Sequence, residues 1–261
     1  MRANRADAVV CGLPCNVLML TGYWPVVGNS LAILTSDGDL QLVTPADEEE
    51  LARRAGVTRI TTFEAGSLSD LRTLSEILSP LLQAVVSEMG LENAIVAYES
   101  DGAFEPASYI SMHFFGDGIF EMLENAFESG SLVAADDLLA RLRAVLTAAE
   151  LSNVREACRI AGDAFESGAR GIAAGQTELE IADAFRRGLS PIRRSGGHVS
   201  CMSGPNSERA SGAFAISGAR AIERGDFVLV HCNSWLEGFW TDITRTWTLG
   251  EPDAKQKAVQ S

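Results

Sequence analysis

The sequence contains few basic residues for its length. Its 261 residues include 21 Lys and Arg against 35 Asp and Glu, so the formal net charge is −14 at pH 7. A nucleic-acid-binding surface needs clustered Lys and Arg to neutralise phosphates. The sequence therefore predicts a protein with no nucleic-acid partner.

Long apolar runs are also missing. No stretch approaches the roughly 20 apolar residues that a helix needs to cross a bilayer. Near the start, Arg2 and Arg5 precede some apolar residues, but Asp7 and Pro14 interrupt the apolar core that a secretory signal peptide requires. We therefore expect no membrane partner.

Cysteines are few, odd in number and scattered. Cys11 and Cys15 flank Gly-Leu-Pro, with no residues of metal-binding type nearby, and the other three are Cys158, Cys201 and Cys232. Disulfide frameworks use even numbers of cysteines and occur in oxidising compartments. The expected state is five reduced thiols in a cytoplasmic protein.

Acidic charge is concentrated in the first part of the chain. Residues 1–145 contain 8 Lys and Arg against 21 Asp and Glu, a difference of −13, whereas residues 146–261 contain 13 against 14, a difference of −1. This step favours two domains, 1–145 and 146–261. The acidic surface either draws in cationic substrates or is a solvated face without a ligand, which is the commoner case.

Strands and helices alternate in the first part. Asp37-Gly38 between two apolar runs predicts a hairpin, because both residues tolerate positive φ. Thr44 followed by Pro45 and several acids is typical of a helix start, with Thr44 as the N-cap. We expect strands at 7–11, 30–36, 40–43, 59–63 and 94–98, and further helices at 68–89 and 136–143. This alternation predicts an α/β domain with a mixed sheet.

The second part begins with helices and continues with strands. Apolar residues at helical spacing predict a helix from Ala148. Thr177 and Glu180 form a capping box, which predicts the start of a second helix. Residues 199–203 are then expected to form a strand.

The stretch 225–250 predicts an antiparallel pair of strands. An apolar run at 227–230 is followed by turn formers at Asn233 and Ser234, and an alternating run returns at 239–249. This arrangement places His231 and Asp242 on one face, with Cβ atoms about 4.5–8 Å apart. An unpaired buried carboxylate is costly, so Asp242 either faces solvent, pairs with Arg245 or belongs to a functional site.

Several phrases of the second part match one family signature. They are GQTELEIA at 175–182, SGPN at 203–206, Gly225-Asp226, Gly238-Phe239, Asp242 and Arg245-Thr246. Together they resemble the pita-bread metallohydrolases, the family of prolidase, aminopeptidase P, methionine aminopeptidase and creatinase. In the first part, DAVV, PCNVLMLTGY and DGDLQLVTP resemble the N-terminal domain of the creatinase and aminopeptidase P branch. The resemblance implies an α/β N-terminal domain followed by an α+β pita-bread domain, of which only the first half is present.

The resemblance also implies site residues. Asp242 falls on the second metal-ligand position, and His231 falls on the first, where the family has Asp. Phe214 falls near the position of a substrate-contacting His, whereas His198 lies upstream and is either a displaced functional histidine or a structural one. We therefore expect His231 and His198 as catalytic residues, Asp242 and His231 as metal ligands, and Phe214 and Arg245 as substrate-binding residues.

The implied metal centre is incomplete in this chain. Intact relatives hold divalent Mn, Co or Zn with two Asp, followed by one His and two Glu from further along the chain, and the sequence stops at Ser261 before those positions. Two ligands are too few to retain a catalytic ion. We also expect strands 199–249 to expose Phe, Trp, Val and Ile that the missing half should cover.

Three interpretations remain open at this stage. The first is a metal-dependent Xaa-Pro peptidase, of the aminopeptidase P or prolidase type, that is inactive as this truncated chain. The second is a metal-independent, creatinase-like hydrolase of C–N bonds, with His231 as base. The third is a non-catalytic fragment that binds partners through its acidic domain. The family resemblance implies a peptide or other small C–N substrate and a homo-oligomer.

Overall fold

The computed structural model describes residues 6–26, 29–64, 69, 71–100, 117–127, 130–189, 195–211 and 216–260. Phe214 lies outside these ranges. The chain divides into two compact units, Met1–Val145 and Leu146–Ser261, and each is described by itself. Among the described residues, no helix combines the length and apolar character needed to cross a membrane.

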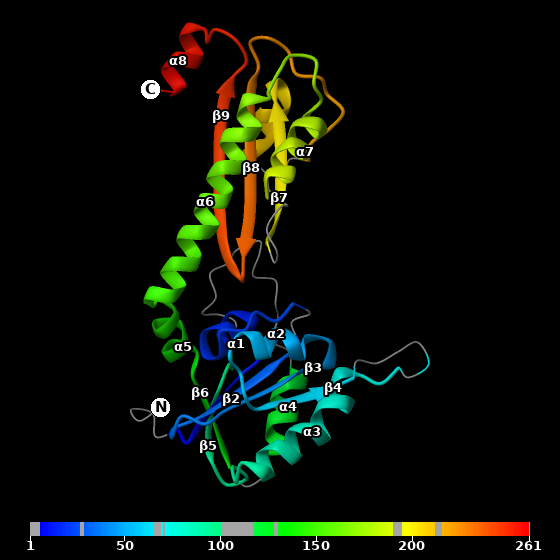
Figure 1. The fold of residues 1–261 in the computed structure, drawn as a ribbon, viewed down its shortest axis with the longest axis vertical. Coiled ribbons are helices and arrows are strands. Elements are labelled where there is room, and N and C mark those ends of the chain that lie inside the picture. Colours follow the sequence, from blue (N-terminus) through cyan, green and yellow to red (C-terminus); the bar gives the residue numbers. More distant parts are fainter. Residues whose placement is uncertain are drawn as a thin grey trace. The chain divides into compact units, whose positions relative to one another are not determined.

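The first unit is built on a six-stranded mixed sheet (Figure 1). Its strands follow the order β4-β3-β2-β1-β5-β6. The pairs β1–β2 and β2–β3 are antiparallel, whereas β3–β4, β1–β5 and β5–β6 are parallel. The strands are β1 (Ala8–Cys11), β2 (Leu31–Thr35), β3 (Leu40–Pro45), β4 (Ile60–Phe63), β5 (Ile95–Tyr98) and β6 (Ser131–Ala134). The predicted α/β domain with a mixed sheet is confirmed.

Helices cover both faces of this sheet. Side chains of α3 (Leu74–Glu88) and α4 (Asp117–Ala126) share one buried core with Val10 and Ile33. Alternate residues of β1, Val9 and Cys11, point to the opposite face and belong to a separate buried cluster. The helices on that side are α1 (Pro14–Thr21), α2 (Glu49–Arg54) and α5 (Asp136–Arg143). Two covered faces explain why the strands of this unit are rich in apolar residues.

Thr44 does not cap a helix, contrary to the expectation. It lies in β3, fully buried, opposite Thr62 of the parallel neighbour β4. Its Oγ1 is hydrogen-bonded to Tyr23 Oη at 3.1 Å and to Ser30 Oγ at 2.9 Å. The first helical turn, η2 (Ala46–Glu48), begins after the strand ends. Pairing with β4 extends β3 through Pro45. The capping signals around Thr44 are local, so they give no information about a neighbouring strand.

The second unit is a three-stranded antiparallel sheet in the order β7-β8-β9. The strands are β7 (Ser195–Ser203), β8 (Phe227–Leu236) and β9 (Phe239–Thr248). Helices α6 (Ala148–Arg170) and α7 (Glu178–Leu189) pack on one face of the sheet (Figure 1). The 3₁₀ segment η4 (Gly204–Ser211) follows β7, and α8 (Ala254–Gln260) follows β9. An antiparallel sheet with helices on one face was the expected architecture, and it is confirmed.

The turn between β8 and β9 lies further along the chain than expected. Pairing continues in register from Phe227–Thr248 to Leu236–Phe239, so Asn233 and Ser234 are within the strand. The turn is Glu237-Gly238, with φ of 52° and 85°. Positive φ at both central residues is typical of the two-residue turns that match the twist of a hairpin. The longer pairing outweighs the turn preference of Asn and Ser.

The expected exposure of large apolar side chains on these strands is wrong for the described residues. Val199, Val228 and Val230 are fully buried against the helices, and Ile243 packs beside them. Only Trp240, 41% exposed, is a markedly exposed large apolar residue on the described parts of the three strands. Val199, Val230 and Ile243 alternate toward the helix side, where α6 and α7 already cover them, whereas Trp235 and Trp240 lie on the other face.

Two glycines of α6 provide a matched stability test. A Cβ on Gly168 would lie 2.6 Å from the buried Phe185 ring, whereas a Cβ on Gly162 would meet nothing within 4 Å. We expect Gly168→Ala to lower the free energy of unfolding by about 1–3 kcal/mol through overpacking. Gly162→Ala should raise it by about 0.5–1 kcal/mol, because Ala favours the helix. Urea unfolding of both variants measures this, and a stabilised Gly168→Ala would contradict the packing.

Candidate functional site

A group of six polar side chains lies on the face of the second sheet that is turned away from α6 and α7. Alternation directs Val199, Cys232 and Ile243 toward the helices, so their sequence neighbours point the other way. The register aligns these neighbours in two rows across the strands. One row is His198, Asn233 and Asp242, and the other is Ser200, His231 and Thr244. We call these six residues the polar face.

His231 lies at the centre of the polar face. Its Nδ1 is hydrogen-bonded to Thr244 Oγ1 at 2.9 Å and is 3.5 Å from Asp242 Oδ1. Its Nε2 is 3.2 Å from Asn233 Nδ2. The predicted proximity of His231 and Asp242 is confirmed. Asp242 also faces solvent, with 69% of its side chain exposed, so its charge is well hydrated.

His198 shares this face but has a different partner. Its Nε2 is hydrogen-bonded to Ser200 Oγ at 2.9 Å. Its register partner on β8 is Asn233, which separates it from Asp242. Ser200 is only 4% exposed, and this burial limits any role of its hydroxyl as a nucleophile. His198 is therefore placed beside the His231–Asp242 pair rather than within it.

Of the two expected substrate residues, the structure describes Arg245, which does not lie on the polar face. Arg245 lies opposite Val230, so it belongs to the helix side of the sheet. Its guanidinium is exposed and donates from Nη1 to the Thr244 carbonyl at 2.8 Å. Phe214 lies outside the described residues. Its expected contact stays a prediction.

Two cysteines flank His231 on the opposite side of the sheet. Cys201 and Cys232 are buried in the helix-side core. Burial raises the pKa of the Cys201 thiol to about 12 and that of the Cys232 thiol to about 11. Both thiols are therefore protonated at neutral pH, so they are poor metal ligands and poor nucleophiles.

The polar face does not fit a two-ion centre. Within the described ranges, no three or more His, Cys, Asp and Glu residues are grouped in a way that could hold a metal ion. His231 and Asp242 supply one imidazole and one carboxylate, and bridging two ions requires several carboxylates. The rows also contain the His198 imidazole, two hydroxyls, and Asn233 Oδ1, which is buried and has no hydrogen-bond partner.

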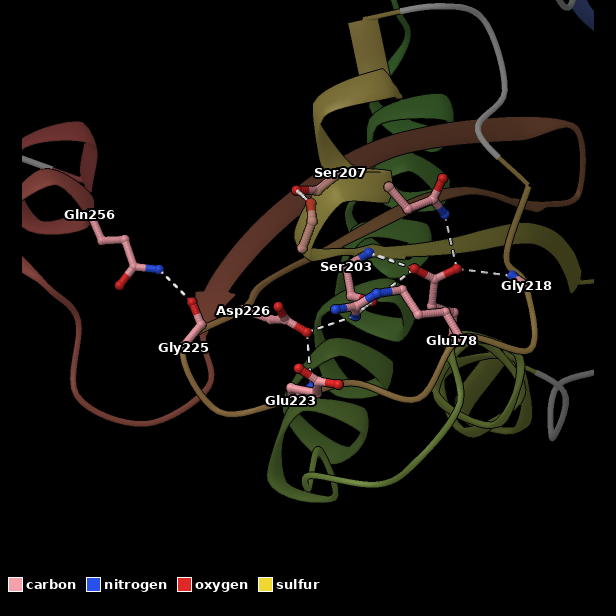
Figure 2. A network of polar contacts seen from close by, with 11 residues as sticks. Glu178, Ser203, Ser207, Gly218, Glu223, Gly225, Asp226 and Gln256 are labelled. Atoms are coloured by element: carbon pink, nitrogen blue, oxygen red, sulfur yellow. Dashed lines mark hydrogen bonds and ion pairs between the residues drawn. The ribbon is translucent and has the colours of Figure 1, made fainter.

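A second polar cluster surrounds Glu178, which is fully buried at the first turn of α7. Its Oε1 accepts hydrogen bonds from the backbone N–H and the hydroxyl of Ser203, at 2.7 and 2.8 Å. Its Oε2 accepts from Asn206 Nδ2 and from the Gly218 N–H, both at 2.9 Å. Figure 2 shows how Ser203, at the end of β7, and Gly218 converge on this carboxylate. The four donors offset the cost of burying a charge.

The same cluster continues to the start of β8. Arg220 Nη1 donates to Ser203 Oγ at 2.7 Å and forms an ion pair with Asp226 Oδ2 at 2.6 Å. Asp226 Oδ2 also accepts from the Glu223 N–H at 2.8 Å, and Gln256 of α8 donates to the Gly225 carbonyl (Figure 2). The cluster joins GQTELEIA, SGPN and Gly225-Asp226, three phrases of the family signature. In this structure the contacts of these three phrases hold α7, the end of β7 and the start of β8 together.

Sequence reasoning missed Glu178 as a central residue. The capping box drew attention to Glu180, whose carboxylate does accept from the Thr177 N–H at 2.8 Å. Glu178 is one helical position from the cap and looks like an ordinary first-turn acid. The signal that could have identified it is SGPN, because its small polar residues provide donors for a buried carboxylate.

These features define a chain of two compact units, in which an α/β unit precedes an antiparallel sheet with helices on one face. Residues 1–145 match the family described as Creatinase/Prolidase N-terminal domain, and residues 152–261 match Metallopeptidase family M24. The chain belongs to this pita-bread metallopeptidase family.

Characterised relatives agree with this assignment. The chain is 24% identical to the Xaa-Pro dipeptidase of Pyrococcus furiosus over 99% of its own length and 65% of that protein's. It is 23% identical to the Xaa-Pro dipeptidase of Pyrococcus horikoshii, over 99% of this chain and 64% of that protein. The chain therefore spans slightly less than two thirds of the length of these relatives.

Solved structures show the same fold. The prolidase from Pyrococcus horikoshii superposes with a TM-score of 0.73 and 22% identity, covering 99% of this chain and 65% of that one. The X-Pro aminopeptidase from Thermotoga maritima gives 0.72 and 20%, covering 99% and 68%. The predicted pita-bread architecture of the second part is confirmed.

The Glu178 cluster predicts a large, position-specific loss of stability. Glu178→Gln places an amide where four donors converge, so at least one buried donor loses its acceptor, at a cost of about 1–3 kcal/mol. Urea unfolding of the second unit measures this loss. The matched control is Glu180→Gln, at an exposed position two residues away. Glutamine can also serve in a capping box, so this substitution should change the free energy of unfolding by less than about 0.5 kcal/mol. Equal effects of the two substitutions would contradict a central role for Glu178.

The polar face predicts weak metal binding. We expect residues 1–261 to bind Mn²⁺ without a tight site, because one imidazole and one carboxylate are available. His231→Asp should strengthen Mn²⁺ binding, because it adds a charged oxygen ligand that can bridge. Electron paramagnetic resonance of free Mn²⁺ counts the bound ions, with His198→Asp as the control on the same face. Two tightly held ions in the unchanged chain would contradict this prediction.

Proposed function

We propose that this chain is an Xaa-Pro peptidase-like hydrolase, of the aminopeptidase P or prolidase type. The observation that carries the proposal is the pairing of His231 with Asp242 on the polar face, at 3.5 Å, within the signature hairpin. The substrate is a peptide or another small molecule with a C–N bond to be cleaved. A divalent cofactor (Mn, Co or Zn), a homo-oligomer and a cytoplasmic location complete the proposal.

The proposal gives roles to five residues, of which His231 has two. Asp242 and His231 are the metal-side residues, and the hairpin supports this by holding them together. His231 and His198 are the candidates for holding or moving a proton, since both imidazoles are on the polar face. Phe214 and Arg245 are assigned to substrate binding through the family resemblance alone.

By themselves, residues 1–261 should be inactive. The described residues contain too few metal-binding side chains at the polar face to assemble the family's two-ion centre. The remaining ligands of the family's centre must then come from elsewhere if this chain is to hydrolyse peptides. Membership of the family therefore does not imply that the 261 residues hydrolyse peptides by themselves.

A metal-independent, creatinase-like hydrolase is the second candidate. The observation in its favour is that His231 Nδ1 faces both Asp242 and Thr244, an arrangement that orients an imidazole. Its Nε2 would then be the atom that accepts a proton, after parting from Asn233. A fragment that only binds partners is the third possibility.

The activity test compares two polypeptides. One is residues 1–261, and the other is a chimera in which residues 1–250 precede the C-terminal third of the Pyrococcus furiosus Xaa-Pro dipeptidase. We expect no hydrolysis of Xaa-Pro dipeptides by the first polypeptide with Mn²⁺, Co²⁺ or Zn²⁺. The chimera should be weakly active and should improve when His231→Asp restores a carboxylate.

Each alternative has its own outcome in this assay. Turnover by residues 1–261 that Asp242→Ala abolishes would overturn the inactivity of the short chain. Robust cleavage of a C–N bond after chelation of all metal would support the creatinase-like candidate instead. A folded chimera that remains inactive with His231→Asp would argue for the partner-binding fragment.

A further inference from the structure

We propose that the tryptophan pair beside the polar face, together with Asp242, binds an organic ammonium ligand, meaning a protonated amine on a small molecule. This binding does not require the proposed hydrolysis, although it uses Asp242, which the proposed function assigns to the metal side. The residues involved are Trp235, Trp240 and Asp242, with Asn233 beside them, and we call these four the amine strip. Its parts are an aromatic surface, a carboxylate and an amide oxygen without a partner.

The aromatic part of the amine strip faces water. Trp235 and Trp240 are register partners next to the hairpin turn, with ring centroids 4.8 Å apart and planes inclined by 38°. Trp240 is 41% exposed. By contrast, Trp247 of the same strand is partly buried on the helix side, where it stacks near Phe165 and Phe185. The core therefore accounts for Trp247, whereas Trp240 packs against Trp235 outside the core and keeps an exposed surface.

The acidic part lies directly beside the tryptophans. Asp242 is two residues from Trp240 on β9, so both side chains project from the same face about 6.5–7 Å apart. Its carboxylate is 69% exposed. On the described parts of the three strands, this face has no Lys or Arg, because Arg245 points to the other side. The imidazole of His231 is 3.5 Å from the Asp242 carboxylate, but on the described parts of this face no Lys or Arg competes for the negative charge next to the exposed indole.

Asn233 adds a separate observation that points to a donor. It is the register partner of Asp242 and is adjacent to Trp235 along the same face of β8. Asn233 is only 8% exposed, and its Oδ1 has no hydrogen-bond partner. A buried amide oxygen without a donor is costly, so a small movement that turns it to a ligand N–H would be favourable.

The chemistry of the amine strip selects an ammonium group over other ligands. The face of an indole attracts a cation through its quadrupole, and the attraction increases when a carboxylate shares the cation. A protonated amine also offers N–H donors to Asp242 and Asn233, whereas a quaternary ammonium does not. An anion would be repelled by Asp242, and a purely apolar ligand would leave the carboxylate and the amide oxygen without donors.

The test measures binding directly, with metal removed by chelation. The four tryptophan indole N–H signals of residues 1–261 are followed by nuclear magnetic resonance during titration with n-butylammonium, and n-butanol is the neutral comparison. Trp240→Phe and Trp235→Phe assign the signals. We expect millimolar binding that shifts the signals of Trp235 and Trp240 and leaves those of Trp24 and Trp247 in place.

Variants separate the contributions of the ring and the charge. Trp240→Leu keeps an apolar side chain but should weaken n-butylammonium binding by about threefold to thirtyfold, whereas Trp240→Phe should retain most of it. Asp242→Asn should weaken binding at an exposed position where folding is not at risk. Glu251→Gln, an exposed acid of the same unit, is the control and should have no effect.

Three results would overturn the proposal. They are no shift with n-butylammonium, equal shifts with n-butanol, or unchanged affinity in Asp242→Asn. None of these depends on hydrolysis, so loss of the amine proposal would leave the proposed peptidase ancestry standing. Inactivity of residues 1–261 would likewise leave the amine proposal standing.

Discussion

The buried carboxylate of Glu178 is the interaction on which the second unit depends. It receives four hydrogen bonds from three segments that follow one another along the chain: β7, η4 and the stretch before β8. A buried charge must be satisfied by its surroundings, because the cost of leaving it without partners exceeds the benefit of most single contacts. The segments that provide the donors are therefore held in one arrangement relative to α7. The Arg220–Asp226 ion pair extends this constraint to the start of the hairpin.

The sheet of this unit has two faces with different tasks. The helix-side face contains valines, cysteines and Trp247, which pack against α6 and α7 and contribute to stability. The other face contains His231, Asp242, His198 and the exposed Trp240, which contribute little to the core. This division explains how a family signature can be present while the site chemistry differs. Several of its residues hold the backbone together, and a substitution such as His at position 231 affects only the outward face.

Much of the fold could be predicted from the sequence because it follows from local patterns. The hairpin at Asp37-Gly38, α5 and the capping box of α7 result from turn chemistry and end signals within a few residues. The Thr44 cap and the turn at Asn233-Ser234 were wrong for a shared reason. At both places a neighbouring strand extends the pairing, and the partner, β4 or β9, could not be identified from local residues.

The candidate site was predictable in part. The period of two along a strand, together with the family resemblance, predicted that His231 and Asp242 would share a face, and the 3.5 Å between His231 Nδ1 and Asp242 Oδ1 agrees. The same period places Arg245 on the other face of the sheet from Asp242. The family signature contains both residues, and that grouping suggested a shared site. The central role of Glu178 could not be derived, because its donors come from positions 25 to 40 residues away.

The pairing of β8 and β9 also restricts which sequence changes this protein can accept during evolution. The ten register pairs continue without a bulge from Phe227–Thr248 to the Glu237-Gly238 turn. A single-residue deletion between Phe239 and Asp242 would exchange the two faces of the rest of β9, turning Asp242 and Thr244 toward Phe165 and Phe185 while sending Ile243 and Trp247 into water. The hairpin can therefore diverge by substitution, as at position 231, but not by insertion or deletion of an odd number of residues. Natural variants of this segment should differ in side chains or by pairs of residues, and single-codon losses there should be eliminated as folding failures before any effect on chemistry could matter.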